Sequence, residues 1–408
     1  MRILIEPGSY SCLNLGDVAM LQVAVARIRV LRPDASLSVV TRNPGVLARC
    51  CPGVRPVAES DRRRWLEGRA LAGRWTWHRL PRLVKLALRC KWKLRGVAGG
   101  EPDAFLKEIE RSDLLLASGM GAWTDAFGEQ AAGTFDLFEI AQRRGIPTAA
   151  FGQGIGPIED GRLWARARAV LPRLEIIGVR ESRTGPALLE RLGVPRSRVV
   201  VTGDDAIELA FERRAAAPGA GLGINLRVSP YSEAGSQTIK TVGTVLERAV
   251  ESLRTFVVPA PISLNAPGSD AETIRRLWRE ESGLSGSLEP ADPAELIRQI
   301  GQCRLVVSGS YHGAVLALAQ GIPAVCLARS RYYADKFLGL ATQFGTGCTV
   351  VVMEDGDWAG ALFQAIQEGW ESAGRFREEL LARAAEQIEA GRGAYRRLFG
   401  LLGAAGGR

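Results

Sequence analysis

The chain has 408 residues, of which 46% are hydrophobic and 24% charged, and this globular profile excludes a largely disordered protein. Its formal net charge is +9. No apolar run reaches the ~18 residues that span a bilayer and the N-terminus lacks a signal-peptide pattern, so we expect a cytoplasmic protein.

The first half of the chain alternates segments of strand and helix character. Strands are expected at residues 2–6, 36–41, 113–117, 147–151 and 175–179, and helices at 16–31, 135–144 and 162–171. Strands that alternate with helices indicate a parallel, doubly wound sheet.

The positive charge is concentrated in residues 62–95. This segment holds twelve Lys or Arg residues against the single acid Glu67, and it contains Trp65, Trp75, Trp77 and Trp92. A peripheral contact with anionic lipid on the inner membrane face is one interpretation, and a solvated helical hairpin is the other. Without a recognised nucleic-acid-binding motif, specific nucleic-acid binding is not expected.

The second half restarts the same alternation after a polar linker at residues 213–221. Strands are expected at 223–226, 255–259, 305–308 and 324–327, and helices at 241–252, 293–301 and 313–320. Residues 357–402 have the period of one long helix that could pack back across both halves. The sequence thus predicts an α/β protein with two Rossmann-like domains, 1–212 with the basic insertion 62–95, and 222–402 with the terminal helix.

Loops that leave the carboxyl ends of parallel strands are the expected ligand sites. The first, residues 8–17, ends in Asn14, Gly16 and Asp17 and would turn backbone N–H groups toward an anion, although an ordinary strand-to-helix turn explains it equally well. The glycine-rich loops 118–122 and 152–157 would bring backbone close to a ligand.

Two further loops contain side chains suited to acid–base chemistry and anion binding. Arg180 follows a strand and could hold a carboxylate or phosphate, unless it only pairs with Glu181 or Asp204. His312 lies at a strand-to-helix corner, where its ring can change protonation near neutral pH. With two histidines in the chain and no zinc-type cysteine spacing, no metal is expected.

The order of these motifs resembles the polysaccharide pyruvyl transferase family. The matching pieces are GSYSCLNLGDVAML at residue 8, GQGIGP at 152, VRESRTGPALLERLGV at 179 with Asp204 beyond it, GINLR at 223 and SGSYHGAVLALAQGIPAV at 308. The resemblance implies a fold similar to that of GT-B glycosyltransferases. It also implies transfer of a pyruvyl group from phosphoenolpyruvate, as donor substrate and without a cofactor, to a saccharide or lipid-linked saccharide as a ketal.

With this resemblance, the candidate catalytic residues are His312 as general acid or base and Asp17 as the group that orients or deprotonates the acceptor. The candidate substrate-binding residues are Arg227, Arg180, Lys336, Asn14, Gly16, Gln153, Gly154, Ser310 and Gly313.

One position departs from the family pattern. The usual Arg-x-His-Gly is Ser310-Tyr311-His312-Gly313 here, so the arginine before the histidine is absent. Its charge could be replaced by Arg227, by Arg180 or by the pair Arg329 and Arg331. The alternatives to pyruvyl transfer are a nucleotide-sugar glycosyltransferase of GT-B type and a non-catalytic family member.

Overall fold

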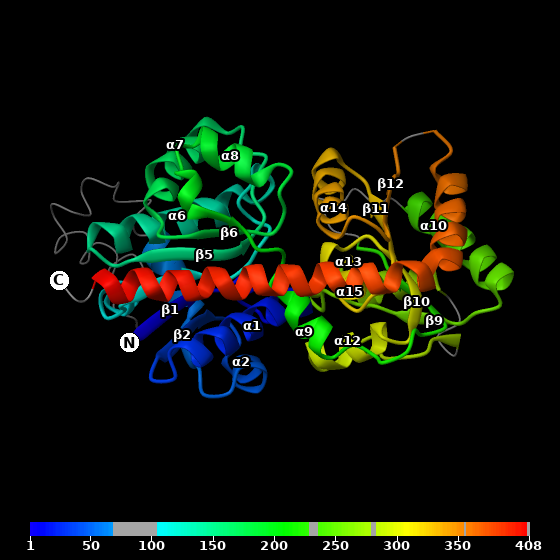
Figure 1. Cartoon of the computed structure of the whole chain (residues 1–408), viewed down its shortest axis with the longest axis horizontal. Coiled ribbons are helices and arrows are strands. Elements are labelled where there is room, and N and C mark those ends of the chain that lie inside the picture. The colour runs from blue at the N-terminus through cyan, green and yellow to red at the C-terminus, as the bar shows by residue number, and fades with distance from the viewer. Residues whose placement is uncertain (68–103, 228–235, 279–282, 355, 406–408) are drawn as a thin grey trace, which may run out of the picture.

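A computed structural model describes residues 1–67, 104–227, 236–278, 283–354 and 356–405. Among them, two parallel sheets form two α/β halves that lie side by side (Figure 1). The expected fold class, two Rossmann-like domains in a GT-B-like arrangement, is confirmed. The chain passes from the first sheet to the second between residues 201 and 221, in the stretch that contains the polar linker expected from the sequence.

The first sheet has seven strands in the order β3-β2-β1-β4-β5-β6-β7. The strands are β1 (Arg2–Glu6), β2 (Ser36–Thr41), β3 (Arg55–Ala58), β4 (Leu114–Ala117), β5 (Thr148–Gln153), β6 (Ile177–Val179) and β7 (Val199–Val201). Most residues of the central strands are apolar and buried. In the register that the strands adopt, Ile3 of β1 lies opposite Leu37 of β2 on one side and Leu114 of β4 on the other. Successive strands run to either side of the β1/β4 pair, which is where ligands bind in such sheets.

Helices cover both faces of this first sheet (Figure 1). One core contains side chains of α6 (Gly128–Arg143), α7 (Gly161–Val170) and α8 (Gly185–Arg191), together with α5 (Ala104–Glu110). The core on the other face contains side chains of α1 (Leu15–Leu31) and α2 (Pro44–Cys50).

The second sheet has five strands in the order β12-β11-β10-β8-β9. They are β8 (Gly221–Asn225), β9 (Val257–Pro259), β10 (Cys303–Ser308), β11 (Ala324–Ala328) and β12 (Cys348–Val352). The surrounding helices are α10 (Ser236–Leu253), α11 (Asp270–Leu277), α12 (Pro293–Ile300), α13 (Tyr311–Leu318) and α14 (Arg331–Phe344). In this sheet the strand order reverses at the β8/β10 pair. Ligands are therefore expected beside the loops that leave the carboxyl ends of these two strands.

Helix α15 (Trp358–Ala405) runs the length of the molecule and packs on both halves, as expected (Figure 1). Near its start, Arg304 donates a hydrogen bond to the Trp370 carbonyl (2.9 Å). Near its end, the Tyr395 ring stacks on Phe151 with centroids 3.9 Å apart. One continuous helix therefore joins the two cores.

Two further elements join the halves beside the cleft. The backbone N–H of Leu15 donates to the Ile262 carbonyl and that of Leu264 donates to the Leu13 carbonyl, both at 2.8 Å. Helix α9 (Ala206–Glu212) packs against α1, α13 and α15. The β1–α1 loop is thus fixed to the second half of the chain.

The basic segment is partly described, and its first residues correct one expectation. Residues 59–67 are helical, and the side chains of Arg62 and Trp65 are buried rather than free to meet lipid. Arg62 pairs with Glu6 at 2.5 Å because a buried guanidinium needs a carboxylate partner. The rest of the proposed membrane-contact segment, including Trp75, Trp77 and Trp92, lies outside the described residues.

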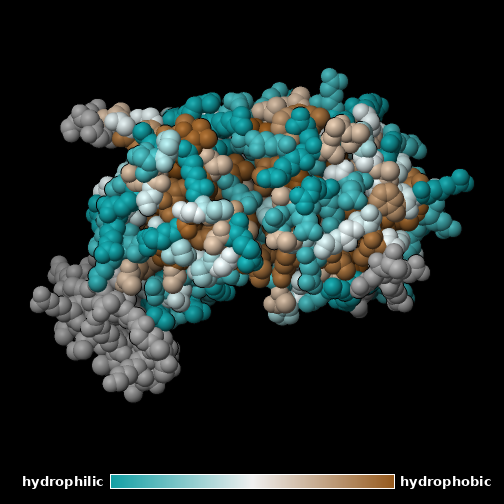
Figure 2. Space-filling view, turned by 90° about the horizontal axis from the view of Figure 1, so that it is seen from below, coloured by the Kyte–Doolittle hydropathy of each residue, from teal (hydrophilic) through white to brown (hydrophobic). Residues whose placement is uncertain are grey.

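The described surface offers little apolar area. Figure 2 shows one face on which hydrophilic residues predominate, with smaller hydrophobic areas among them. Across the described ranges, the exposed large hydrophobic side chains are Val30, Phe256 and Leu401. No helix within those ranges is long and apolar enough to cross a membrane.

Candidate active site

The first component of the site is the start of α1. Asn14 caps this helix, since its side-chain oxygen accepts hydrogen bonds from the backbone N–H groups of Gly16 (3.1 Å) and Asp17 (3.3 Å). The cap fixes Asp17 in the first helical turn, where a carboxylate is favoured by the helix dipole. Burial raises the pKa of Asp17, although His312, Arg180 and Arg227 counteract the rise.

The second component is the turn from β10 into α13. Ser308 Oγ accepts a hydrogen bond from the Ser310 N–H (3.1 Å) and donates one to the Ser310 carbonyl (2.9 Å). This local turn lets α13 begin at Tyr311, so His312 lies in the first turn of a helix rather than in the preceding loop. A Cβ on Gly313 would overlap Ser308 Oγ, which explains the glycine there.

His312 lies between two carboxylates from the other half of the molecule. Its Nδ1 is 3.9 Å from Asp17 Oδ1 and its Nε2 is 3.5 Å from Asp204 Oδ2. Burial alone would raise the pKa of Asp204, but His312, Arg180 and the Ala206 N–H outweigh it and hold this pKa below the usual value. One carboxylate is therefore stabilised as an anion, whereas the other is not.

Arg180 is the most enclosed cation of the site, with 3% of its side chain exposed. Its Nη1 is 3.6 Å from Asp204 Oδ2, and its guanidinium lies 4.0 Å from the centroid of the Tyr311 ring. A Cβ on Gly154 would come within 2.7 Å of Arg180 Nε, and one on Gly121 would overlap its Nη2. Both glycines leave the space that the guanidinium occupies.

Two more basic side chains face the same space. Lys336 donates hydrogen bonds to the Gly121 carbonyl (3.4 Å) and to the Tyr332 hydroxyl, which itself donates to Gly121 O (2.8 Å). Burial, together with Arg180 and Arg227, holds the pKa of Lys336 well below its usual value. Arg227 follows β8 and contributes to the field at Asp17 and Asp270.

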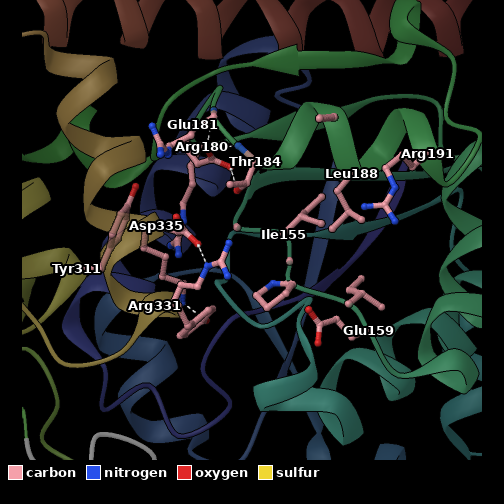
Figure 3. Close-up of a pocket in the computed structure, with 18 of the residues that line it drawn as sticks. Ile155, Glu159, Arg180, Glu181, Thr184, Leu188, Arg191, Tyr311, Arg331 and Asp335 are labelled. Carbon is pink, nitrogen blue, oxygen red and sulfur yellow. Dashed lines mark hydrogen bonds and ion pairs between the residues drawn. The ribbon is translucent and has the colours of Figure 1, made fainter. Parts of the chain in front are cut away.

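These side chains line two adjoining cavities between the halves. The inner cavity, about 240 Å³, contains Asp17, Arg227 and His312. The outer cavity, about 680 Å³, extends between α8 and α14 and has an apolar wall that includes Ile155 and Leu188 (Figure 3). Arg180, Tyr311 and Lys336 line both cavities, so they mark the passage between them.

The structure brings most of the predicted site residues together. The inner cavity is lined by Asn14, Asp17, Arg180, Arg227, Ser310, His312 and Lys336. Gly16 lies against the His312 ring, and Gly154 lines the outer cavity.

Three predicted residues line neither cavity: Gly16, which lies behind the His312 ring, Gln153 and Gly313. Gln153 is fully buried and donates hydrogen bonds to the carbonyls of Phe151 (2.9 Å) and Ala117 (3.4 Å), which holds neighbouring strands. Gly313 packs over Ser308. Of the pair Arg329 and Arg331, Arg331 lines the outer cavity with its side chain 97% exposed.

Three residues of the site were not assigned a role from the sequence. Asp204 was noted as a possible salt-bridge partner and as part of the motif order, without a role of its own, although it lies in the loop that follows β7, at the same edge as the other loops. Tyr311 lines both cavities, and Tyr332 lines the outer one. For Asp204 the position after a strand was a usable signal, whereas the tyrosines sit in helices with no pattern that marks them.

The fold is shared with nucleotide-sugar enzymes. A putative UDP-N-acetylglucosamine 2-epimerase from Listeria monocytogenes superposes with a TM-score of 0.59 at 12% identity, covering 97% of this chain and 94% of that one. The UDP-GlcNAc 2-epimerase of Neisseria meningitidis, bound to UDP-GlcNAc, gives 0.55 at 15% identity with 98% and 99% covered. Arabidopsis thaliana UGT89C1, complexed with UDP-L-rhamnose, gives 0.56 at 13% identity with 98% of both chains covered.

Sequence comparison gives the family. No curated protein matches the chain significantly. The family model described as polysaccharide pyruvyl transferase matches residues 14–331, which is more than half of the 408 residues and runs from the cap of α1 to the start of α14. The chain therefore belongs to the polysaccharide pyruvyl transferase family.

Proposed function

We propose that this protein transfers a pyruvyl group from phosphoenolpyruvate to two hydroxyl groups of a saccharide, forming a cyclic ketal. The observation that supports this most directly is the position of His312. It lies in the inner cavity between Asp17 and Asp204, with Arg180, Arg227 and Lys336 lining the same space.

The inner cavity suits a small dianionic donor. Phosphoenolpyruvate carries a carboxylate and a phosphate, and arginine binds such groups through paired, charge-assisted hydrogen bonds. Arg180 and Arg227 supply guanidinium groups and Lys336 an amine that can take up a proton when an anion arrives. Ser310 stands where the family has arginine, and Arg180 supplies a buried charge beside it.

The chemistry then needs one proton delivered and two removed. Protonation of the donor methylene carbon by His312 leaves positive charge at C2, and the first saccharide hydroxyl adds to C2 as it loses its proton. Phosphate then leaves with the C2–O bond electrons, and the second hydroxyl adds and loses its proton. The products are the ketal and inorganic phosphate, and Asp17 is placed to accept a hydroxyl proton.

The outer cavity suits the acceptor. Its volume exceeds that of the inner cavity, and its wall combines the apolar Ile155 and Leu188 with polar groups at the rim, as in a saccharide-binding cleft (Figure 3). An acceptor there would reach the inner cavity past Arg180 and Tyr311. A lipid-linked saccharide is the form of acceptor that we propose to test second. Peripheral contact of the basic segment 62–95 with a membrane would bring it, without Arg62 and Trp65, whose side chains are buried.

The first test is calorimetric titration of the purified protein with phosphoenolpyruvate and then with UDP-GlcNAc. We expect phosphoenolpyruvate to bind, and its affinity to fall at least about tenfold in Arg227→Ala, since a charge-assisted contact is lost. Arg196→Ala, whose side chain is 84% exposed and pairs with Glu190, serves as control. UDP-GlcNAc binding without phosphoenolpyruvate binding would favour a nucleotide-sugar glycosyltransferase.

Catalysis is tested separately by phosphate release with a saccharide panel. His312→Ala should abolish release above background while it leaves the fold intact by circular dichroism. If the protein bound neither donor, a non-catalytic role within the family would replace our proposal.

A further inference from the structure

Asp204 is buried beside the imidazole of His312, in a position where it can orient that ring. It lies in the loop between β7 and α9, and its side chain is completely buried. Oδ1 accepts a hydrogen bond from the Ala206 N–H at 2.9 Å, which fixes the rotation of the carboxylate. Oδ2 lies 3.5 Å from Nε2 of His312 and 3.6 Å from Arg180 Nη1, and among the described residues Oδ2 and Nε2 have no other hydrogen-bond partner.

The backbone of Gly16 restrains the same imidazole from a second direction. Because a Cβ at Gly16 would overlap the His312 ring, the ring is packed on the first turn of α1. The Tyr311 ring is edge-on to it, with centroids 5.8 Å apart. The imidazole is therefore confined between α1, the β7–α9 loop and its own helix.

The charged groups around the ring differ in character on its two sides. Asp204, with Arg180 behind it, faces Nε2, whereas Asp17 faces Nδ1. Arg227 and Lys336 line the same cavity. The pKa of Asp204 is lowered and that of Asp17 is raised, so Asp204 is the carboxylate that remains a hydrogen-bond acceptor only.

We propose that Asp204 is a positioning residue that accepts the Nε2–H of His312, and thereby fixes one neutral tautomer with Nδ1 unprotonated toward Asp17 and the inner cavity. The second ring nitrogen of a histidine is commonly set in this way by the hydrogen bond that the first one makes. The tautomer assignment is independent of the proposed function, whereas its use in proton transfer rests on it.

This arrangement gives the two carboxylates different tasks. His312 would first take up a proton from solvent at Nδ1, on the side of the cavity, and the charged ring would then deliver that proton to the donor methylene carbon, while Nε2 keeps its own proton throughout. When the ring is charged, Asp204 stabilises it, and no rotation of the ring is required between steps because both nitrogens already face their partners.

The tautomer can be measured without donor or acceptor. The chain has two histidines, so a His78→Gln protein labelled with ¹⁵N-histidine reports on His312 alone. In slightly alkaline solution, where a free imidazole is neutral, ¹⁵N chemical shifts and couplings to the ring protons distinguish the protonated nitrogen from the bare one. We expect Nε2 to carry the proton. A spectrum with the proton on Nδ1 would overturn the proposal, and it requires no site variant to fold.

A conservative substitution tests the cause. In Asp204→Asn the amide can donate to Nε2, so the proton should move largely to Nδ1, the tautomer error that the corresponding change produces in serine proteases. Asp17→Asn, on the opposite side of the ring, should keep Nε2–H as the major form. An unchanged tautomer in a folded Asp204→Asn protein would contradict the role of Asp204.

An activity measurement links this tautomer to function. If pyruvyl transfer is confirmed, Asp204→Asn should lower kcat at least about 100-fold with little change in the KM for phosphoenolpyruvate. Absence of all transfer activity in the wild-type protein would refute the proposed function but leave the spectroscopic result intact, so the two failures are distinguishable.

Discussion

The imidazole of His312 packs directly on the backbone of Gly16, although the two residues belong to different halves of the molecule. No side chain, not even a methyl group, fits between them. The contact depends on the seam that joins the β1–α1 loop to residues 262–264. The site is thus assembled by the closure of two halves rather than carried by one.

Gly16→Ala should therefore displace the His312 ring. Because an error of about 1 Å in a catalytic group costs roughly 100-fold in rate, we expect a loss of that size in kcat for phosphate release. The matched control is Gly45→Ala in α2, where the added methyl meets only Asn43 Oδ1 at 3.8 Å. Equal activity of Gly16→Ala and wild type would show that the contact is not needed.

Gly154→Ala should weaken donor binding through Arg180. The new methyl would come within 2.7 Å of Arg180 Nε and push the guanidinium from its place above Tyr311. We expect about a tenfold or greater rise in the calorimetric Kd for phosphoenolpyruvate, equivalent to about 1.4 kcal/mol. Gly161→Ala, at the start of α7 with open space around it, should bind the donor as the wild type does.

Arg27→Met should destabilise the joint between α1 and α9. The Arg27 side chain is buried and pairs with Asp205 (2.5 Å) and Glu208 (2.6 Å). Its removal leaves the buried carboxylate of Asp205 without its charged partner. A loss of about 3–5 kcal/mol in the free energy of unfolding follows. Urea denaturation measures it, with Arg196→Met at the exposed Arg196–Glu190 pair as control. A change below about 1 kcal/mol would mean that the pair contributes little.

The two carboxylates beside His312 should affect stability with opposite pH dependence. The pKa of Asp17 is raised in the folded protein, so the wild type loses stability from this group as the pH rises through that raised pKa. The pKa of Asp204 is lowered, so its contribution is present above the unfolded pKa and is lost as the pH falls toward the lowered one.

Thermal unfolding of both asparagine variants at about pH 4 and pH 8 measures this difference. Relative to wild type, the Tm of Asp17→Asn should improve from the lower to the higher pH, while that of Asp204→Asn should worsen. Parallel trends in the two variants would contradict the assignment of opposite shifts.

The sequence was sufficient for most of the strands and for the alternation of strand and helix, but not for every element. Strand β1 was expected at the observed residues, and α1 and α15 within a few positions. The reason is that β1 is a short apolar run before a glycine-containing loop, α1 is a long and largely apolar stretch, and α15 repeats apolar side chains with the period of a helix. Helix α14 and strand β12 were not foreseen: α14 mixes aromatic, charged and small residues, whereas the successive valines of β12 were a usable signal. Motif order, rather than any single motif, predicted the family.

The sequence also named the ionisable residues Asp17, Arg180, Arg227, His312 and Lys336 of the inner cavity, because loops at the carboxyl ends of parallel strands meet at one edge. It could not say which carboxylate would face which nitrogen of His312, nor that Gln153 would turn into the sheet. Those relations depend on how α1, α9 and α13 pack across the two halves. Local composition determined which chemical groups were present, and only the closure of the domains decided which of them meet.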